Sequence, residues 1–154
     1  MRLNLTTDYA IRVLIYLATD ETRLHAVGDV SRAYAMPHST VMKVVSDLVR
    51  QGFVDSVRGR SGGIRFSRPA AEISLSEIIA AAEDSMVIAD CGTCVLAPRC
   101  RLKSIFAEAV AAFIAVLRRY TLSDVTENPD ELLALFHHAP QFQTGCATAG
   151  APGS

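Results

Sequence analysis

Three cysteines lie close together in the second half of the 154-residue sequence, at a spacing that would let their thiolates bind one metal site. Cys91, Cys94 and Cys100 form the pattern C-x-x-C-x-x-x-x-x-C. Thiolates are soft ligands that suit iron–sulfur clusters and zinc. Three thiolates leave one coordination position to be filled by another kind of ligand. A fourth ligand that is not a thiolate would bind its metal ion more weakly and leave that ion accessible to a small reactive molecule. The pattern predicts a metal or cluster site, and the alternative is a set of thiols with no ligand role.

The sequence indicates a cytoplasmic protein, and thiols stay reduced in that compartment. No apolar run approaches the ~18–20 residues that a membrane span needs. The amphipathic start contains Asp8 and Arg12, which a signal peptide would not. We therefore expect a cytoplasmic protein without a membrane partner, in which structural disulfides are rare. The fourth cysteine, Cys146, falls in a Gly-, Ala- and Thr-rich tail over residues 139–154, which is predicted to be disordered with a free thiol.

A redox enzyme is the competing interpretation of the first two cysteines. The sequence Cys91-Gly92-Thr93-Cys94 has the spacing of a thiol–disulfide oxidoreductase motif. Such a motif normally opens a helix after a strand in a βαβ unit, and no βαβ pattern precedes it here. It would also leave Cys100 unexplained. Because no other catalytic constellation is present, we expect a protein that is not an enzyme.

The elements that must position these residues are mainly helical. Hydrophobic periodicity of about 3.6 residues predicts helices, and a switch to a period of two predicts a short hairpin. Thr6 and Thr7 are candidate N-caps of the first helix, which runs to about Asp20. The other expected elements are helices over 27–34 and 38–51, a hairpin over 53–66, a helix from Ser74 or Ser76 to about 82, and helices over 101–120 and 129–137. The fold class is therefore mainly α with a small β-hairpin wing.

Two helices joined by a tight turn and followed by a basic hairpin have the order of a winged helix-turn-helix. Residues 1–70 carry ten Lys and Arg against six Asp and Glu, a net charge of +4, whereas residues 71–154 carry five against ten, a net charge of −5. The basic half predicts contact with double-stranded DNA, through a helix in the major groove and a wing in the minor groove. A solvated basic surface on an ordinary helical domain is the alternative. The candidate DNA-binding residues are Ser39, Thr40, Lys43, Arg50, Arg58, Arg60 and Arg65.

The helix over 101–120 carries a stripe of apolar residues that alternates steps of four and three. This stripe is a short coiled-coil seam, and it predicts a homodimer. The seam positions are Leu102, Phe106, Ala109, Phe113, Val116 and Tyr120. The resulting organisation is a DNA-binding domain over 1–84, a cysteine loop over 85–100, a dimerisation helix and C-terminal helix over 101–138, and the tail over 139–154.

Four stretches resemble a known family: TTDYAIRVLIYLA, MPHSTVMKVVSDLVRQGFVDSVRGRSGGIRFSRP, EISLSEII and CVLAPRCRLK. The family is that of the small dimeric winged-helix repressors that include the iron–sulfur regulator IscR and the nitric-oxide sensor NsrR. The resemblance covers about residues 1–135. It implies a homodimer, a palindromic operator and an iron–sulfur cluster whose state controls the affinity for DNA. VRGRSGGIR and the CVLAPRC loop resemble the nitric-oxide-sensing branch, which implies nitric oxide as the effector.

The same resemblance implies a ligand set. In the nitric-oxide-sensing relatives the matching cysteines hold the cluster, and an Asp in the first helix is supplied by the other subunit. Asp8 occupies that position, although a first-turn acid is also favoured by the helix dipole alone. The gap between Cys91 and Cys94 is shorter than in the relatives, and the gap before Cys100 matches. A [4Fe-4S] cluster is expected, with [2Fe-2S] as the alternative.

The expected function is therefore a DNA-binding transcriptional repressor whose operator affinity is controlled by a nitric-oxide-sensitive iron–sulfur cluster. Two other regulators share this architecture. One is an iron-status or redox sensor, and the other is a zinc-stapled DNA-binding protein that senses nothing.

Overall fold

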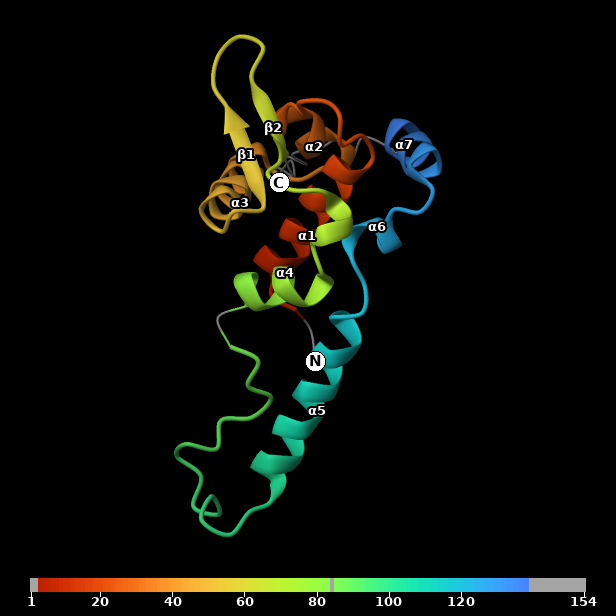
Figure 1. The fold of residues 1–154 in the computed structure, drawn as a ribbon. Helices are drawn as coiled ribbons and strands as arrows, with labels where there is room; N and C mark the ends of the chain where they lie inside the picture. The colour runs from red at the N-terminus through yellow and green to blue at the C-terminus, as the bar shows by residue number, and fades with distance from the viewer. Residues whose placement is uncertain (1–2, 84, 139–154) are drawn as a thin grey trace, which may run out of the picture.

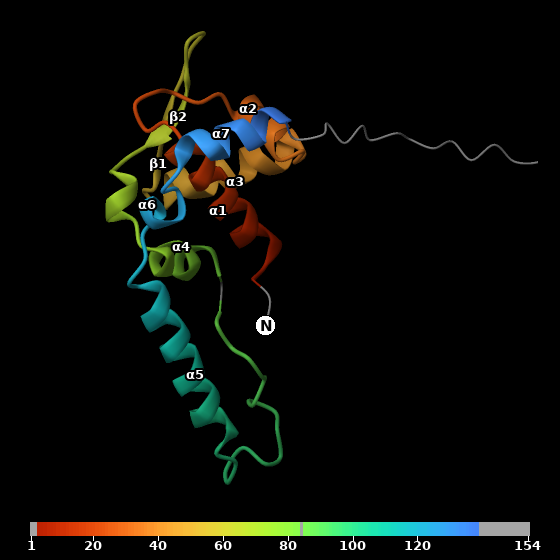
Figure 2. The same ribbon diagram turned by 90° about the vertical axis from the view of Figure 1, so that its right-hand side faces the viewer.

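The computed structural model describes residues 3–83 and 85–138, and two regions stand out in Figures 1 and 2. Residues 3–83 form a rounded N-terminal unit. Residues 85–117 leave this unit as a long loop and return as a single helix, and we call this segment the arm. Residues 118–138 then pack back against the N-terminal unit. The predicted tail over 139–154, with Cys146, lies outside the described residues.

The fold is mainly α with a two-stranded antiparallel sheet, as the sequence predicted. The helices of the N-terminal unit are α1 (Leu5–Ala18), α2 (Val27–Ala33), α3 (His38–Arg50) and α4 (Leu75–Ala82), with a 3₁₀ turn η1 (Ala70–Glu72). The sheet pairs β1 (Val54–Val57) with β2 (Gly63–Phe66). The later helices are α5 (Leu102–Leu117), α6 (Leu122–Val125) and α7 (Pro129–His138). None of the described helices is long and apolar enough to cross a membrane.

Helix α1 begins earlier than its threonines suggested. Its N-cap is Asn4, whose side-chain oxygen accepts a hydrogen bond from the Thr7 backbone N–H at 2.8 Å. Thr7 lies inside the helix and is fully buried, and its hydroxyl donates to the same oxygen at 3.1 Å. The prediction of Thr6 or Thr7 as N-cap is therefore wrong, because Asn4 has the extended backbone of an N-cap and its side chain accepts from the Thr7 N–H of the first turn.

The turn between α2 and α3 is tight and partly strained. Ala35 adopts a φ of 50°, which side chains other than glycine seldom adopt. The Ser31 hydroxyl donates to the Met36 carbonyl at 2.6 Å, and the Met36 N–H donates to the Ser31 carbonyl at 3.0 Å. After Pro37, α3 buries the predicted stripe of Val41, Val44, Val45 and Leu48. The sequence thus predicted both helices and the turn between them.

Near its turn end, β2 gains a second backbone partner that the sequence did not reveal. His25 pairs with Ile64 through two backbone hydrogen bonds of 2.9 Å. A side chain at Gly63 would place its Cβ 2.7 Å from the His25 carbonyl oxygen, and one at Gly62 would lie 2.2 Å from the Val57 carbonyl oxygen. A side chain at either position would therefore collide with backbone, within the wing at Gly62 and with the His25 segment at Gly63, whatever the wing contacts.

The C-terminal helices return to the N-terminal unit. Leu122 of α6 is fully buried in the core, and α6 contacts α1 and η1. Phe136 of α7 stacks against Tyr16 and Tyr34, with ring centres 5.2 and 5.0 Å apart. The boundary expected at residue 101 groups α6 and α7 with α5, whereas in the structure both helices pack against the N-terminal unit. Helix α6 was not predicted because four residues show no periodicity.

Helix α5 is shorter than predicted and contributes nothing to the core. It ends at Leu117, and none of its residues is buried. The chain turns after α5 so that the Tyr120 carbonyl accepts a hydrogen bond from the Leu75 N–H at 2.9 Å. The placement of Tyr120 on the α5 stripe is therefore wrong, because Tyr120 lies in the turn after α5 and is hydrogen-bonded to the first residue of α4, Leu75.

Candidate DNA-binding surface and metal-binding loop

The start of α3 is open to solvent and carries no opposing charge. Its N-cap, Pro37, makes no side-chain cap, and its first turn holds no acidic residue. His38 and Ser39 are exposed there, Thr40 is half-buried, and Lys43 is exposed one turn later. Because the N-terminus of a helix carries a partial positive charge and free N–H groups, this end suits a phosphate or a base edge.

Arg50 is placed at the opposite end of α3. Its guanidinium lies 2.7 Å from the Asp47 carboxylate, in an ion pair of the i, i+3 type. Arg50 therefore shares its charge with a neighbour, while Lys43 makes no such pair in the described part of the chain. Of the two α3 cations that are predicted to bind DNA, Lys43 is therefore the one whose charge is not shared with a carboxylate, so it is more available to a phosphate.

The wing presents its cations at its tip, which Figure 1 shows at the end of the molecule opposite the arm. Arg58 and Arg60 are exposed in the turn between β1 and β2. Arg65, on β2, faces Asp55 across the hairpin at 4.0 Å. The three predicted wing arginines therefore lie on one small projection, with Arg58 and Arg60 at its tip.

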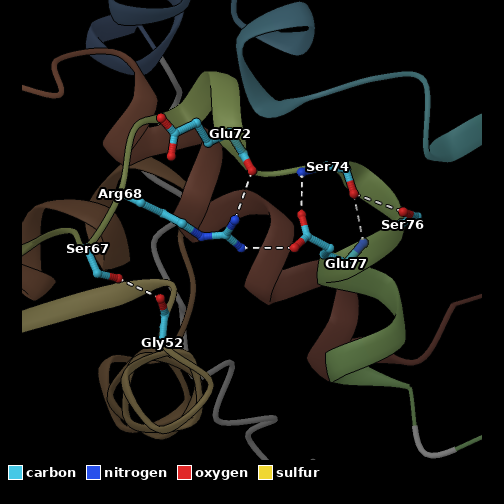
Figure 3. Close-up of polar contacts among 7 residues, drawn as sticks. All are labelled: Gly52, Ser67, Arg68, Glu72, Ser74, Ser76 and Glu77. Atoms are coloured by element: carbon cyan, nitrogen blue, oxygen red, sulfur yellow. Dashed lines mark hydrogen bonds and ion pairs between the residues drawn. The ribbon is translucent and has the colours of Figure 1, made fainter.

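Arg68 fixes the segment after the wing, a structural role that sequence reasoning missed because it counted this residue only as charge. Figure 3 shows its guanidinium directed toward η1 and α4, where it donates to the Glu72 carbonyl at 2.9 Å and pairs with Glu77 at 3.2 Å. The same group lies 5.7 Å from the centre of the Phe53 ring. Arg68 therefore ties the exit of the wing to α4. The Ser74-x-x-Glu77 capping box, visible in the sequence, could have indicated a fixed carboxylate there.

The carboxylate of Glu77 is held in its ionised form. Its pKa is lowered by the hydrogen bond from the Ser74 backbone N–H, and the Arg68 guanidinium adds to the effect. Beside this contact the Ser67 hydroxyl donates to the Gly52 carbonyl at 2.7 Å, as Figure 3 also shows. The segment after the wing is thus fixed both to the end of α3 and to the start of α4.

The three cysteines lie on the far loop of the arm. Their thiols are free; Cys91 is half-buried, and Cys94 and Cys100 are exposed. Cys91 lines an apolar groove of about 610 Å³ between the loop and α5, together with Phe106 and Val110. Within residues 3–83 and 85–138, no three metal-binding side chains come together. The structure therefore places the thiols on one loop without assembling them around a common point.

Asp8 is in the N-terminal unit and has a partner of its own. Its carboxylate lies 2.8 Å from the Arg12 guanidinium, and the side chains of both residues are more than two-fifths exposed. The Arg12 guanidinium also lies 5.9 Å from the centre of the Tyr34 ring, just before the helix-turn-helix turn. Within one chain the structure does not bring Asp8 to the cysteines.

Comparison with known proteins decides the family. A family model described as Rrf2, iron-dependent transcriptional regulator, matches residues 3–128. The chain belongs to the Rrf2 family of transcriptional regulators. An Rrf2 regulator is a DNA-binding protein and not an enzyme. The thiol–disulfide interpretation of Cys91 and Cys94 is therefore wrong, and the Cys91-to-Cys94 segment indeed opens no helix in the structure.

Curated relatives cover nearly the whole of this Rrf2 chain. The HTH-type transcriptional regulator NsrR of Shouchella clausii is 37% identical over 150 residues, which are 94% of this chain and 98% of that protein. The regulator of the same name from Bacillus subtilis is 36% identical over 141 residues, 88% of this chain and 97% of that protein. Protein aau3 of Rhizobium meliloti is 37% identical and covers 82% of this chain and 86% of its own.

Solved structures show the same fold. IscR of T. potens superposes with a TM-score of 0.70 at 20% identity, over 85% of this chain and 90% of that one. CymR, the global cysteine regulator of B. subtilis, superposes with a TM-score of 0.66 at 22% identity, over 82% and 97% of the two chains. The predicted winged-helix fold is confirmed by these likenesses together with the helices and hairpin of this structure.

Proposed function

We propose that this Rrf2 regulator is a repressor that binds a palindromic operator as a homodimer, and that a nitric-oxide-sensitive iron–sulfur cluster controls its operator affinity. The observation that carries the proposal is the cysteine loop, where three free thiols lie within ten residues on the surface of the arm. Relatives named NsrR, similar over almost the whole chain, support the same branch of the family.

The cysteine loop has the donor chemistry for such a cluster. Cys91, Cys94 and Cys100 would hold it, since thiolates are the usual ligands of iron–sulfur clusters. The loop from 85 to 100 has no regular secondary structure and no buried residue, so its backbone can close to bring the sulfurs together. When bound, a [4Fe-4S] cluster would supply iron that reacts with nitric oxide, and a [2Fe-2S] cluster is the alternative.

The fourth ligand in this proposal is Asp8 of the partner subunit. Asp8 lies on α1, away from the cysteines of its own chain, and its carboxylate is exposed enough to be reached. In forming such a contact the carboxylate gives up its ion pair with Arg12. Because exposed ion pairs contribute only about 0–1 kcal/mol, that exchange is inexpensive.

Dimerisation through α5 follows from its uncovered apolar surface. Leu102, Ile105 and Val116 are exposed although they belong to a helix with almost no polar residues. A second copy of α5 would cover this surface through knobs-into-holes packing. Two copies would also present two α3 helices and two wings to a palindrome, as helix-turn-helix dimers do.

The test of the proposal is anaerobic purification followed by absorption spectroscopy and counts of iron and sulfide. We expect a brown protein with broad visible absorption that is lost on titration with nitric oxide. Cys94→Ser and Cys100→Ser should abolish the colour, whereas Cys146→Ser, the matched control outside the loop, should keep it. A colourless wild-type protein that binds zinc would overturn the proposal and favour a zinc-stapled regulator.

Asp8→Ala tests the inter-subunit ligand separately. Three thiolates remain in this variant, so we expect it to keep a cluster with an altered spectrum or an altered response to nitric oxide. If the variant matches the wild-type protein in spectrum, lability and release of DNA, Asp8 is not a ligand.

An iron-status or redox sensor is the second candidate, and the family description as iron-dependent favours it. The two candidates differ in effector. An iron-status sensor changes its operator affinity on iron chelation and is indifferent to nitric oxide at equal iron content. A nitric-oxide sensor responds to nitric oxide added stoichiometrically to the cluster.

A further inference from the structure

Both ends of the arm are connected to helix α4. The arm follows α4 in the chain, and the segment after α5 is hydrogen-bonded to the start of α4. The cysteine loop begins at residue 85, three positions after Ala82, the last residue of α4. Where the chain returns from α5, the Leu75 N–H donates to the Tyr120 carbonyl at 2.9 Å, and Ser74 forms a β-bridge with Thr121. Figures 1 and 2 both show α4 lying across the root of the arm. A movement of the arm therefore acts first on α4.

The C-terminal end of α4 is held by the cap residues of two other helices, Asn4 before α1 and Gln51 after α3. The Gln51 side-chain amide donates to the Ala81 carbonyl at 2.7 Å. The Asn4 side-chain amide donates to the Ala82 carbonyl at 3.2 Å, and its backbone N–H donates to the Glu83 carboxylate at 2.8 Å. The last carbonyls of a helix have no partner within the helix, so these donors satisfy groups that would otherwise need water. We call these three contacts the α4 junction.

Helix α4 contacts both elements that are predicted to read DNA, and the α4 junction reaches one of them. Gln51 is the C-cap of α3 and follows directly on Arg50. A polar hollow of about 320 Å³ opens at the junction, lined by Asn4, Gln51, Lys43 and Arg50 among others. At the other end of α4, the Arg68–Glu77 pair fixes the exit of the wing. One eight-residue helix thus contacts the arm, the recognition helix and the wing.

We propose that α4 transmits the state of the cysteine loop to the recognition helix, and that Gln51 and Asn4 are the positioning residues through which it does so. This inference rests on the proposed function, which gives the loop two states. The Gln51 amide holds the end of α3 in register with the last turn of α4. When the loop closes or opens, the last turn of α4 shifts, and the orientation of α3 shifts with it. Energetic coupling of this kind typically changes affinity by 5–150-fold.

A competing route runs from α5 through α6 into the core, because Leu122 is buried against η1 and its N–H donates to the Ile73 carbonyl at 3.0 Å. That route reaches α1 and does not use Gln51 or the Asn4 side chain. The two routes therefore respond differently to substitutions at the α4 junction.

Two substitutions remove the two side-chain donors of the junction. Asn4→Asp keeps an oxygen that can accept from the Thr7 N–H, so α1 keeps its N-cap, but it has no amide to donate to Ala82. Gln51→Met keeps the length of the side chain without a donor. Val49→Met is the matched control, because it places the same side chain at an exposed position of the last turn of α3. Gln51→Lys restores a donor and should rescue the coupling.

The measured quantity is the ratio of operator affinities between the cluster-loaded and cluster-free forms of each full-length protein. We expect Asn4→Asp and Gln51→Met to bring this ratio at least about 5-fold closer to one, while the Val49→Met and Gln51→Lys proteins keep the wild-type ratio. A purely structural role would lower both affinities together and leave the ratio unchanged. An unchanged ratio in both junction variants overturns the inference and favours the route through α6.

The experiment distinguishes failure of the proposed function from failure of the coupling through the α4 junction. Visible absorption and iron content are recorded on every sample, so a colourless wild-type protein contradicts the cluster and not the junction. In that case the same ratio is measured between protein alkylated at the loop thiols and unmodified protein, both in the Cys146→Ser background. A wild-type ratio above one that falls toward one in the junction variants supports the coupling. A ratio of one in the wild type, or one unaffected by the substitutions, overturns it.

Discussion

The N-terminal unit and the arm are both rich in apolar residues, yet they bury them to very different extents. Apart from Leu122, the core consists of residues between Ala10 and Ile79, and many of these are fully buried. In α5 only Lys103, Ser104 and Glu108 are neither aliphatic nor aromatic, and no residue of the helix is buried. A helix that is apolar nearly all round is stable in water only when something covers it. The N-terminal unit therefore buries its apolar residues within one chain, with Leu122 of α6 completing its core, whereas α5 leaves its own apolar residues uncovered. The homodimer proposed above would cover them.

The largest effect should come from a cavity in the N-terminal unit. Leu14 is fully buried in α1, so Leu14→Ala should lower the free energy of unfolding by about 2–5 kcal/mol. The matched change in the arm, Val116→Ala, removes a side chain that is 44% exposed in one chain. Chemical denaturation at a concentration where the protein is monomeric should show a cost below about 1 kcal/mol for Val116→Ala. Equal costs for the two variants would erase the contrast between unit and arm.

Breaking the interface proposed for the arm should have the next largest effect. Phe113→Glu places a carboxylate in the α5 seam and should yield a monomer by analytical ultracentrifugation. Since a monomer contacts only one half-site, operator affinity should fall by about 100-fold or more.

The control for this substitution is Ala115→Glu, on the α5 face where Glu108 already lies two turns earlier. It adds the same charge and should leave both the dimer and the DNA affinity intact. A Phe113→Glu protein that remains dimeric would move the interface to another part of the chain.

The wing should contribute a smaller, salt-dependent effect. Arg60→Ala should weaken operator binding severalfold and flatten the slope of log affinity against log salt by about one unit, because one phosphate contact is lost. Iron content should not change. Arg118→Ala, at the end of α5, is the control cation, and fluorescence anisotropy at several salt concentrations measures both variants. Identical slopes for Arg60→Ala and wild type would show that the wing tip does not touch DNA.

The smallest effect concerns the pH dependence of the N-terminal unit. His25 is buried between the wing and Tyr16; its Nε2 bonds the Asp20 carbonyl at 2.7 Å, and its Nδ1 has no partner in the described part of the chain. Burial lowers the pKa of His25, and the Asp20 hydrogen bond only partly opposes this. The folded state therefore binds fewer protons than the unfolded state, whose histidine pKa is about 6.5.

Stability is then complete above about pH 6.5 and is lost as the pH falls from there toward the folded-state pKa. The loss should not exceed about 1.4 kcal/mol per pH unit. Denaturation midpoints between pH 5 and 7.5 should show this slope in the wild type and in His38→Gln, and a flatter one in His25→Gln. A His25→Gln protein with the full slope would assign the acid sensitivity elsewhere.

The same contrast explains which parts of the fold were predictable from the sequence. Helices α1, α3, α4 and α5 and the hairpin each carry a repeated apolar pattern long enough to detect, and burial of the α3 stripe followed directly. Helix α6 is four residues long, and the His25–Ile64 pairing joins residues far apart in sequence, so neither leaves a periodic signal. Tyr120 was misplaced because its apolar spacing continues the seam although the helix has already ended.

The candidate site was predictable in its chemistry and less so in its geometry. Residue type and spacing suffice to indicate the thiols and the basic side chains. The ion pairs of Asp8 with Arg12 and of Asp47 with Arg50 have i, i+4 and i, i+3 spacings. These are the spacings of neighbours on one face of a helix, so both pairs could have been predicted from the sequence. The role of Arg68 depends on where η1 and α4 pass, which only the folded chain determines.

The central claim is that the arm senses and the N-terminal unit reads. It is tested most directly by titrating nitric oxide into the anaerobic, cluster-loaded homodimer while visible absorbance and operator binding are recorded on the same sample. We expect absorbance and operator binding to fall together, with the same stoichiometry of nitric oxide per cluster. A protein that keeps its operator affinity after the absorbance is fully bleached, or that binds the operator equally well without any cluster, would contradict it.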